Sequence, residues 1–138
     1  MGPDIYDARA SGAALVDAAV REAKAAGKHV LLDFGTNWCV WCRRLHHTLT
    51  THAEVQAALQ KDYVFAMIDL NTRKGVKRNA DLDARYGNLL KHGIPVLVVL
   101  DGDGKQLTTQ ETGELENGRD GHDPGKIIAF LEKWAPRK

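Results

Sequence analysis

The chain has 138 residues, and 43% of them are hydrophobic, which is enough for one compact domain with an apolar core. Lys and Arg total 19 against 18 Asp and Glu, so no electrostatic footprint points to nucleic acid or to an anionic membrane. The longest apolar run, residues 94–100, is far shorter than the ~20 residues that span a bilayer. We expect a single domain over residues 1–138 that has no membrane span, binds no nucleic acid and is a monomer.

The N-terminal residues leave the cellular location open. They lack both the basic region and the apolar stretch of a signal peptide, which by itself does not establish a cytoplasmic address. We expect a flexible or extended segment at residues 1–10. A helix is predicted from Ser11 to Gly27, because Ser11 suits an N-cap, apolar side chains recur on one face, and Gly27 suits the residue after the last turn.

A buried strand with one acidic residue follows this helix. Residues 30–34 are apolar except for Asp33, which is typical of a central strand, and the strand should end at Gly35. Burial would raise the pKa of the Asp33 carboxyl and make it a candidate proton acceptor for a neighbouring thiol. The alternative is an exposed carboxylate on an edge strand.

The two cysteines of the chain, Cys39 and Cys42, come directly after this strand. A disulfide across so short a loop would add little stability, since its entropic effect grows with loop length, so the pair favours redox reactivity. At the first turn of a helix, free backbone N–H groups and the helix dipole would lower the pKa of Cys39 below its usual ~8.5. We therefore expect Cys39 to be the nucleophile and Cys42, on the same helix face, to be the resolving thiol.

Two tryptophans, Trp38 and Trp41, flank the cysteines. Exposed aromatic surface there would contact substrate polypeptides, and the alternative is that both rings belong to the core. The intervening pair, Val40 and Trp41, contributes neither a proline nor a histidine. This argues against a strongly oxidising couple and for a reducing or intermediate potential.

A metal site is the alternative use of these cysteines. Cys39, Cys42 and His46 have the spacing C-x2-C-x3-H, with His47 and His52 nearby, and zinc accepts such ligands. A structural zinc site needs four ligands, usually from two separate segments, whereas all the candidates here lie on one helical stretch. We therefore expect no metal, and no cofactor beyond the redox-active cysteine pair.

The rest of the chain alternates between helix and strand. The helix after the cysteines should restart at Thr51, where Thr51-x-x-Glu54 has the spacing of a capping box. After this helix the sequence predicts a strand at 63–69 and a solvated basic loop at 71–79, to which we assign no function. A helix is expected at 81–92 with Leu82, Tyr86, Leu89 and Leu90 inward. Strands at 94–100 and 105–112 should flank a hairpin turn, and a last helix should run from Asp123-Pro124 to Trp134. This order predicts an α/β fold whose mixed sheet is covered by helices on both faces.

Pro95 stands at the beginning of an apolar strand, where proline is tolerated. A cis Ile94-Pro95 bond would turn the backbone N–H and C=O of Ile94 toward the cysteines, where they could pair with an extended substrate. A trans bond is the alternative, and the residues alone favour it, because only about 5 to 6% of X-Pro bonds are cis.

These motifs resemble the thioredoxin superfamily in their order and context, and the resemblance extends over residues 11–134. It rests on the strand at 30–34, Trp38-Cys39-x-x-Cys42, Gly93-Ile94-Pro95 before an apolar strand, and Gly113 after the hairpin. Within the superfamily, residues 37–42 followed by 49–59 are similar to the C-terminal domain of DsbD-type thiol:disulfide interchange proteins and to small bacterial thioredoxin-like disulfide isomerases.

The resemblance implies a thioredoxin fold with an N-terminal helix and a cis Pro95, and it assigns the nucleophile to Cys39, the resolving thiol to Cys42 and the buried acid to Asp33. It implies a reductase or isomerase in the periplasm or another exported setting, with protein thiols and disulfides as substrates and an upstream electron donor. A cytoplasmic thioredoxin-type reductant is the competing interpretation. The lysine that thioredoxin places in its next strand has no counterpart at residues 63–69.

Overall fold

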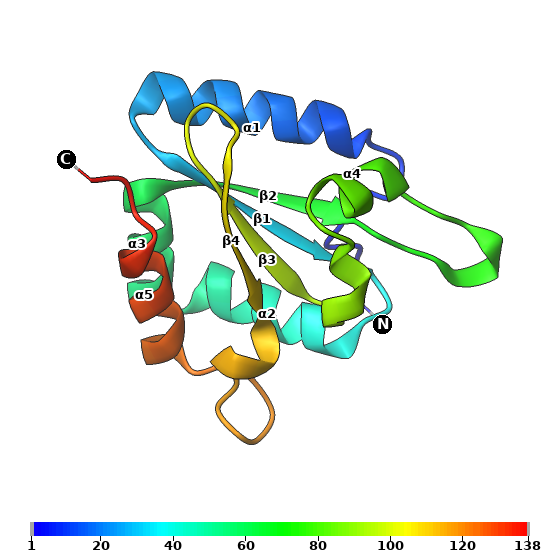
Figure 1. Cartoon of the computed structure of the whole chain (residues 1–138). Coiled ribbons are helices and arrows are strands. Elements are labelled where there is room, and N and C mark those ends of the chain that lie inside the picture. The colour runs from blue at the N-terminus through cyan, green and yellow to red at the C-terminus, as the bar shows by residue number, and fades with distance from the viewer. Residues whose placement is uncertain (1, 138) are drawn as a thin grey trace.

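The computed structural model describes residues 2–137 and has a four-stranded mixed sheet at its centre (Figure 1). The strands are β1 (His29–Gly35), β2 (Tyr63–Asp69), β3 (Val96–Leu100) and β4 (Gln106–Glu111), in the order β2-β1-β3-β4. β1 pairs parallel with β2 and antiparallel with β3, and β3 pairs antiparallel with β4. The mixed sheet predicted from the sequence is thus confirmed.

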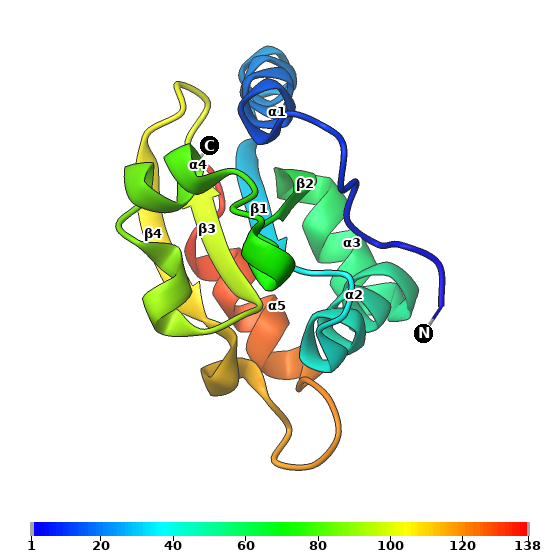
Figure 2. The same cartoon turned by 90° about the vertical axis from the view of Figure 1, so that its right-hand side faces the viewer.

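Helices cover both faces of this sheet, as predicted (Figure 2). The described part of the chain forms five α-helices: α1 (Gly12–Ala26), α2 (Val40–Thr51), α3 (Ala53–Asp62), α4 (Ala80–Arg85) and α5 (Pro124–Lys133). Short 3-10 helices lie at Arg73–Gly75, Leu89–His92 and Thr112–Leu115. α1 and α4 pack on one face, and α2, α3 and α5 pack on the other. Within residues 2–137, no helix is long and apolar enough to cross a membrane.

Alternation along β1 decides which side chains reach the face covered by α2. Val30, Leu32 and Phe34 belong to the core cluster under α1, whereas Leu31 belongs to the cluster under α2. Because successive strand residues point to opposite faces, Asp33 lies on the same face as Leu31. This register places a carboxyl group beneath the start of α2.

The predicted helix ends are correct at α1 and wrong at α3. Ser11 caps α1 by accepting the N–H of Ala14, and Gly27 ends the helix with a φ of 69°. The predicted capping box at Thr51 does not form, because the Thr51 hydroxyl donates to the carbonyl of His47 within α2. His52 caps α3 instead, with its Nδ1 accepting the N–H of Val55 at 3.3 Å.

The predicted helix at 81–92 is broken in two. α4 ends at Arg85, Gly87 and Asn88 take φ values of 100° and 60°, and a 3-10 helix begins at Leu89. A positive φ at two successive residues is incompatible with a continuing right-handed helix. Leu90 consequently lies 40% exposed and does not point inward as predicted.

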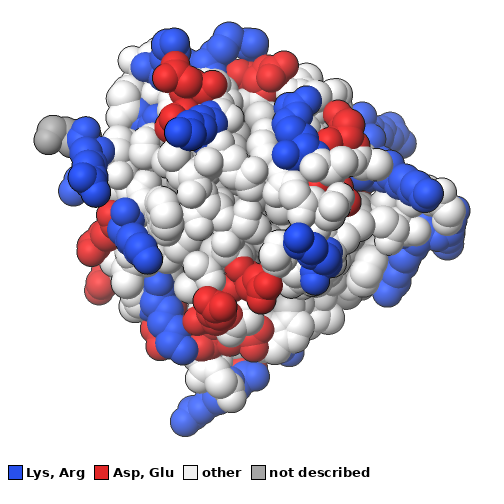
Figure 3. All heavy atoms as spheres, in the orientation of Figure 1, with Lys and Arg blue, Asp and Glu red and all other residues white. Residues whose placement is uncertain are grey.

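Charged side chains are distributed over the surface without a single dominant patch on the face shown in Figure 3. Acidic side chains gather below the centre of this face and basic ones along its right-hand edge, while the formal net charge of the chain is only +1. The segment between β2 and α4, which carries Arg73, Lys74, Lys77 and Arg78, extends away from the sheet in Figure 1.

Candidate active site

The cysteine pair lies where β1 turns into α2. β1 ends at Gly35, and Cys39 adopts an extended conformation as the N-cap of α2, which begins at Val40, one residue later than predicted. The Cys39 Sγ accepts the backbone N–H of Cys42 at 3.2 Å. Both sulfurs are free thiols and buried, and Cys42 is the more deeply placed, with 0% exposure against 8% for Cys39.

This arrangement makes the two sulfurs unequal. A hydrogen bond from the Cys42 thiol lowers the pKa of Cys39 to about 7, and the backbone N–H groups of Cys42 and Trp41 act in the same direction, while burial opposes them. The shared hydrogen bond, followed by burial, raises the pKa of Cys42 well above its usual value. The sequence predicted a lowered pKa for Cys39, and Cys39 has it. The largest cause is the hydrogen bond from the Cys42 thiol and not, as expected, the backbone N–H groups at the start of the helix.

Asp33 lies under the cysteines and is completely buried, with 0% exposure. Its sheet neighbours are Met67 on β2 and Leu97 on β3, which offer no charge. Loss of solvation raises the pKa of the carboxyl from 3.8 to about 7, a hydrogen bond from Tyr6 opposes this shift, and the charge of Cys39 adds to it. A carboxyl with such a pKa exchanges its proton near neutrality.

Tyr6 is the residue of this site that the sequence did not reveal. Its hydroxyl donates to Oδ1 of Asp33 at 2.6 Å, and the side chain is 1% exposed. Residues 2–10 contain neither helix nor strand, yet they are fixed against the loop before Cys39, because Asn37 Oδ1 accepts the N–H groups of Ile5 and Tyr6. Met1, the remaining residue of the segment expected to be flexible or extended, lies outside the described residues.

Trp38 and Trp41 lie beside the cysteines and are partly buried, each with an arginine over one ring face. The Trp38 indole donates to Asn71 Oδ1 at 2.9 Å, and the Arg73 guanidinium lies 3.5 Å from its ring centroid. The basic segment 71–79, to which the sequence assigned no function, therefore covers Trp38.

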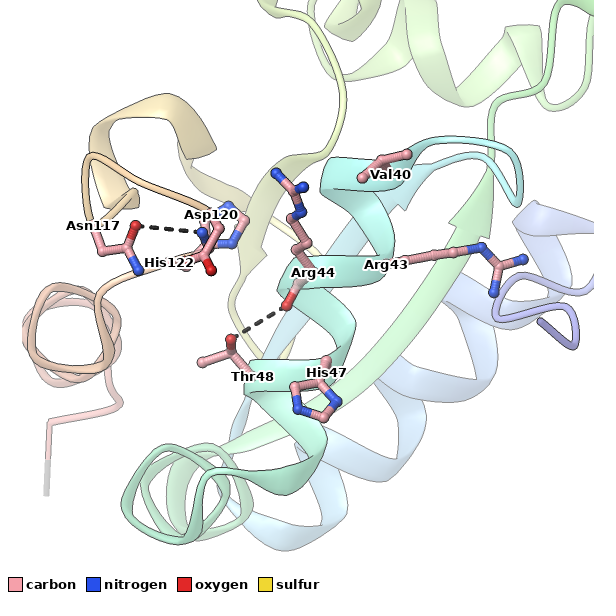
Figure 4. A pocket seen from close by; sticks show the side chains of 9 residues that line it. Val40, Arg43, Arg44, His47, Thr48, Asn117, Asp120 and His122 are labelled. Atoms are coloured by element: carbon pink, nitrogen blue, oxygen red, sulfur yellow. Dashed lines mark hydrogen bonds between the residues drawn. The ribbon is translucent and has the colours of Figure 1, made fainter. Parts of the chain in front are cut away.

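The second ring lies next to a surface pocket. Arg44 lies 4.6 Å from the Trp41 ring centroid on one side, and the His122 ring meets Trp41 edge-on at 5.6 Å. A pocket of about 490 Å³ opens beside Val40, between α2 and the loop 117–122 (Figure 4). The Arg44 side chain extends between α2 and the loop 117–122, whereas the Arg43 side chain points toward the N-terminal segment. This pocket adjoins Cys39 through Val40.

The Ile94-Pro95 segment borders Cys39 on another side. The bond between the two residues is cis, and the Ile94 carbonyl oxygen lies 3.8 Å from the Cys39 Sγ. The Thr112 hydroxyl donates to the Pro95 carbonyl at 2.7 Å and fixes the segment from the far side. Ile94 is half-buried and Pro95 is buried.

The histidines considered as metal ligands do not gather around the cysteines. Across residues 2–137, no three His, Cys, Asp or Glu side chains form a group that could hold a metal ion. His52 serves as the cap of α3, as described above.

Comparison with known proteins identifies the family. A model of the thioredoxin-like family matches residues 13–102, so the chain belongs to that family. It is 37% identical over 98 residues to the thiol:disulfide interchange protein DsbD of Ralstonia nicotianae, which covers 71% of the chain and 15% of that protein. It is 31% identical over 131 residues to DsbD of Klebsiella pneumoniae, covering 91% of the chain and 19% of the relative. The chain thus spans less than a fifth of the length of these relatives.

Solved structures agree with this relationship. A disulphide isomerase from Xylella fastidiosa superposes with a TM-score of 0.81 at 33% identity, covering 96% of this chain and 98% of that one. The C-terminal domain of Neisseria meningitidis DsbD in its oxidised form superposes with a TM-score of 0.63 at 24% identity, covering 98% and 100%. The predicted thioredoxin fold and its relationship to the DsbD C-terminal domain are therefore confirmed.

The hydrogen bond between the two thiols predicts how alkylation of Cys39 depends on pH. In the reduced protein the rate with iodoacetamide should rise with a midpoint near the Cys39 pKa of about 7. In Cys42→Ala the midpoint should move up by about one unit, since the largest cause of the lowered pKa is lost, whereas Cys42→Ser keeps a donor and should stay closer to the native value. Equal midpoints in all three proteins would show that the Cys42 thiol does not lower the pKa of Cys39.

The buried carboxyl predicts how stability depends on pH. The Asp33 pKa is raised from 3.8 to about 7 on folding, so the folded state holds this proton more tightly, and its contribution to stability is lost as the pH rises from about 4 through 7. Asp33→Asn should therefore be more stable than the native protein at about pH 8, by up to roughly 4 kcal/mol, and the difference should shrink toward about pH 4.

Denaturant unfolding of the reduced proteins at both pH values measures this difference. Asp17→Asn, which removes an exposed carboxylate on α1, is the matched control for the change in net charge. A native protein as stable as Asp33→Asn at the higher pH would show that burial of the carboxyl has no energetic cost.

Proposed function

We propose that this domain is a thiol-disulfide oxidoreductase that exchanges a Cys39–Cys42 disulfide with protein thiols, acting as a reductase or isomerase. The observation that carries the proposal is the inequality of the two thiols: the outer sulfur has its pKa lowered to about 7, and the inner one has its pKa raised by the same hydrogen bond and by burial. A CxxC pair used in exchange requires such a division between attacking and resolving thiols.

The proposed reaction has two steps. The Cys39 thiolate attacks one sulfur of a substrate disulfide, and the other substrate sulfur leaves with the electron pair of the broken bond. Cys42 then attacks Sγ of Cys39 while its proton passes to Asp33, so that the Cys39–Cys42 bond forms and the second substrate sulfur leaves as a thiolate. The protein dithiol loses two electrons to the substrate, and an upstream electron donor restores it. No other cofactor is needed.

The surroundings of Cys39 support contact with an extended polypeptide. Ile94 and Pro95 border the sulfur, and a substrate backbone beside them could pair with the polar groups of Ile94. Trp38 and Trp41 flank the same opening, and Val40, 48% exposed, gives it an apolar edge next to the pocket. We propose these four residues, Trp38, Trp41, Ile94 and Pro95, as the substrate contacts.

The location proposed for this reaction is the periplasm or another exported compartment. The relationship to thiol:disulfide interchange proteins DsbD supports it, although the chain matches only 15 to 19% of two of those proteins. The alternative, a cytoplasmic thioredoxin-type reductant, would be favoured by efficient reduction of the domain by a flavin-dependent thioredoxin reductase.

Substitution of each cysteine tests the division of roles. Cys39→Ser should abolish the acceleration that the domain gives to the slow reduction of insulin by dithiothreitol, since the attacking sulfur is lost. Cys42→Ser should retain the attack and accumulate mixed disulfides with the substrate, visible by mass spectrometry, because the resolving sulfur is lost. Full turnover by either variant would rule out the two-step reaction.

The redox potential tests the direction of electron flow. Strong oxidants of this class lower the nucleophile pKa to about 3.5, whereas a pKa near 7 accompanies a reducing couple. With the Cys39 pKa at about 7, we expect equilibration with glutathione to give a potential between about −270 mV, typical of a reductase, and about −180 mV, typical of an isomerase. A value near about −120 mV would refute this expectation and indicate an oxidant.

A further inference from the structure

We propose that Tyr6 is a positioning residue for the exchange reaction, which orients Asp33 so that one carboxylate oxygen stays free to receive the proton of Cys42. The inference rests on the proposed function and adds the N-terminal segment to the site. The cysteine motif does not point to this segment, and the family match begins at residue 13, after it.

The two oxygens of Asp33 have different surroundings. Oδ1 accepts the Tyr6 hydroxyl at 2.6 Å, whereas Oδ2 is buried and has no hydrogen-bond partner in the described part of the chain. A carboxylate held through one oxygen cannot rotate freely, so the other oxygen keeps one direction. Oδ2 is therefore the oxygen available to take a proton.

Cys42 lies close to the same pair of groups. A Cβ atom added to Gly35 would lie 2.5 Å from the Cys42 Sγ and 2.5 Å from the Tyr6 Oη. Both atoms therefore occupy the space that a side chain at position 35 would fill. Electrostatic interactions link Asp33 to Cys42 and Tyr6 to both of them. The thiol, the carboxyl and the phenol form one buried cluster.

The segment that carries Tyr6 is attached to the cysteine loop itself. The Asn37 side chain accepts two backbone N–H groups of the segment and donates to the Tyr6 carbonyl at 2.9 Å. Arg43, on the first turns of α2, donates to the Asn37 carbonyl at 2.8 Å and to the Pro3 carbonyl at 2.9 Å. The same residues thus hold the loop before Cys39 and the phenol behind it.

Among residues 2–137, the Tyr6 hydroxyl is the only hydrogen-bond donor to the carboxyl oxygens of Asp33. The titratable groups that face the carboxyl are Tyr6 from the N-terminal segment and Cys39 and Cys42 from the start of α2. The adjacent strands contribute Met67 and Leu97, which are apolar, and no cation forms an ion pair with the carboxyl in this part of the chain.

The aromatic disulfide dithiobis(nitrobenzoate) is a probe that separates the two steps. The Cys39 thiolate attacks one sulfur of the reagent, the S–S bond of the reagent breaks and one thionitrobenzoate leaves, and a mixed disulfide forms between Cys39 and the other thionitrobenzoate. Cys42 then attacks Cys39, its proton moves to Asp33, the Cys39–Cys42 bond forms, and a second thionitrobenzoate leaves. The reagent takes two electrons from the dithiol. The absorbance of the released thiolate therefore shows two phases, and the second one reports on proton transfer from Cys42.

The decisive variant is Tyr6→Phe, which keeps the ring and removes the hydroxyl. The hydrogen bond from Tyr6 lowers the pKa of Asp33, so its loss should raise the midpoint of the pH profile of the second phase by about one unit and slow that phase about tenfold at about pH 6. The rate above about pH 9, where the carboxyl is ionised in both proteins, should still fall by about twofold or more, because the carboxylate is no longer held in one orientation. The first phase should keep its rate.

Tyr63→Phe is the matched control. It removes another buried tyrosine hydroxyl, which donates to the Leu131 carbonyl of α5 at 2.8 Å, and it should leave both phases unchanged. Asn37→Ala loosens the segment without touching the phenol and should shift the second-phase midpoint in the same direction as Tyr6→Phe. In an Asp33→Asn background, Tyr6→Phe should change the second phase by less than about twofold, because the group that it positions is gone.

An unchanged midpoint in Tyr6→Phe, an equal shift in Tyr63→Phe, or a full effect of Tyr6→Phe on top of Asp33→Asn would each overturn the inference. None of these outcomes affects the proposed exchange reaction. That reaction fails separately if the first phase is absent in the native protein, since Cys39 would then not attack the disulfide.

Discussion

The constraint on which the site depends is the burial of one carboxyl group inside a sheet. Asp33 stands on a central strand between Met67 and Leu97 and is fully buried, and among residues 2–137 no cation pairs with its ionised form. The phenol of Tyr6 partly compensates by donating a hydrogen bond to the carboxyl, whereas the charge of Cys39 disfavours the ionised carboxyl further. The bare backbone of Gly35 leaves the space in which the phenol and the Cys42 thiol meet.

The start of α2 and the buried carboxyl act on the cysteine pair in opposite directions. Cys39 occupies the N-cap, where an oxygen of Ser, Thr, Asp or Asn usually accepts a backbone N–H, and its sulfur makes that bond best as a thiolate. The cap therefore stabilises the reduced pair, which makes a couple more oxidising. Negative charge on Asp33 disfavours a thiolate nearby and makes the couple more reducing. For Cys39, burial opposes the hydrogen bonds from the Cys42 thiol and the backbone, and its pKa is about 7, whereas the charge of Asp33 contributes to the raised pKa of Cys42.

Features encoded by neighbouring residues could be predicted from the sequence. The caps of α1, the apolar runs of β1 and β3 and the mixed sheet follow from periodicity and from local signals such as Ser11 and Gly27. The errors also have local causes. Thr51 had the correct spacing for a cap but bonds back to His47, and the helix expected through residue 92 is broken by the left-handed conformation of Asn88, a residue that also occurs inside helices.

The part of the site that escaped prediction is held by contacts between distant residues. Cys39, Cys42 and Asp33 lie within ten positions of one another, so a strand followed by a helix is enough to bring them together. Tyr6 reaches Asp33 across 27 positions, through a segment without helix or strand, and no periodicity carries such information. Its one trace in the sequence is a large aromatic residue in a stretch without helix or strand periodicity. A buried ionisable group needs a hydrogen-bond partner. Since β2 carries no basic residue beside Asp33, the donor to its carboxyl has to come from another part of the chain.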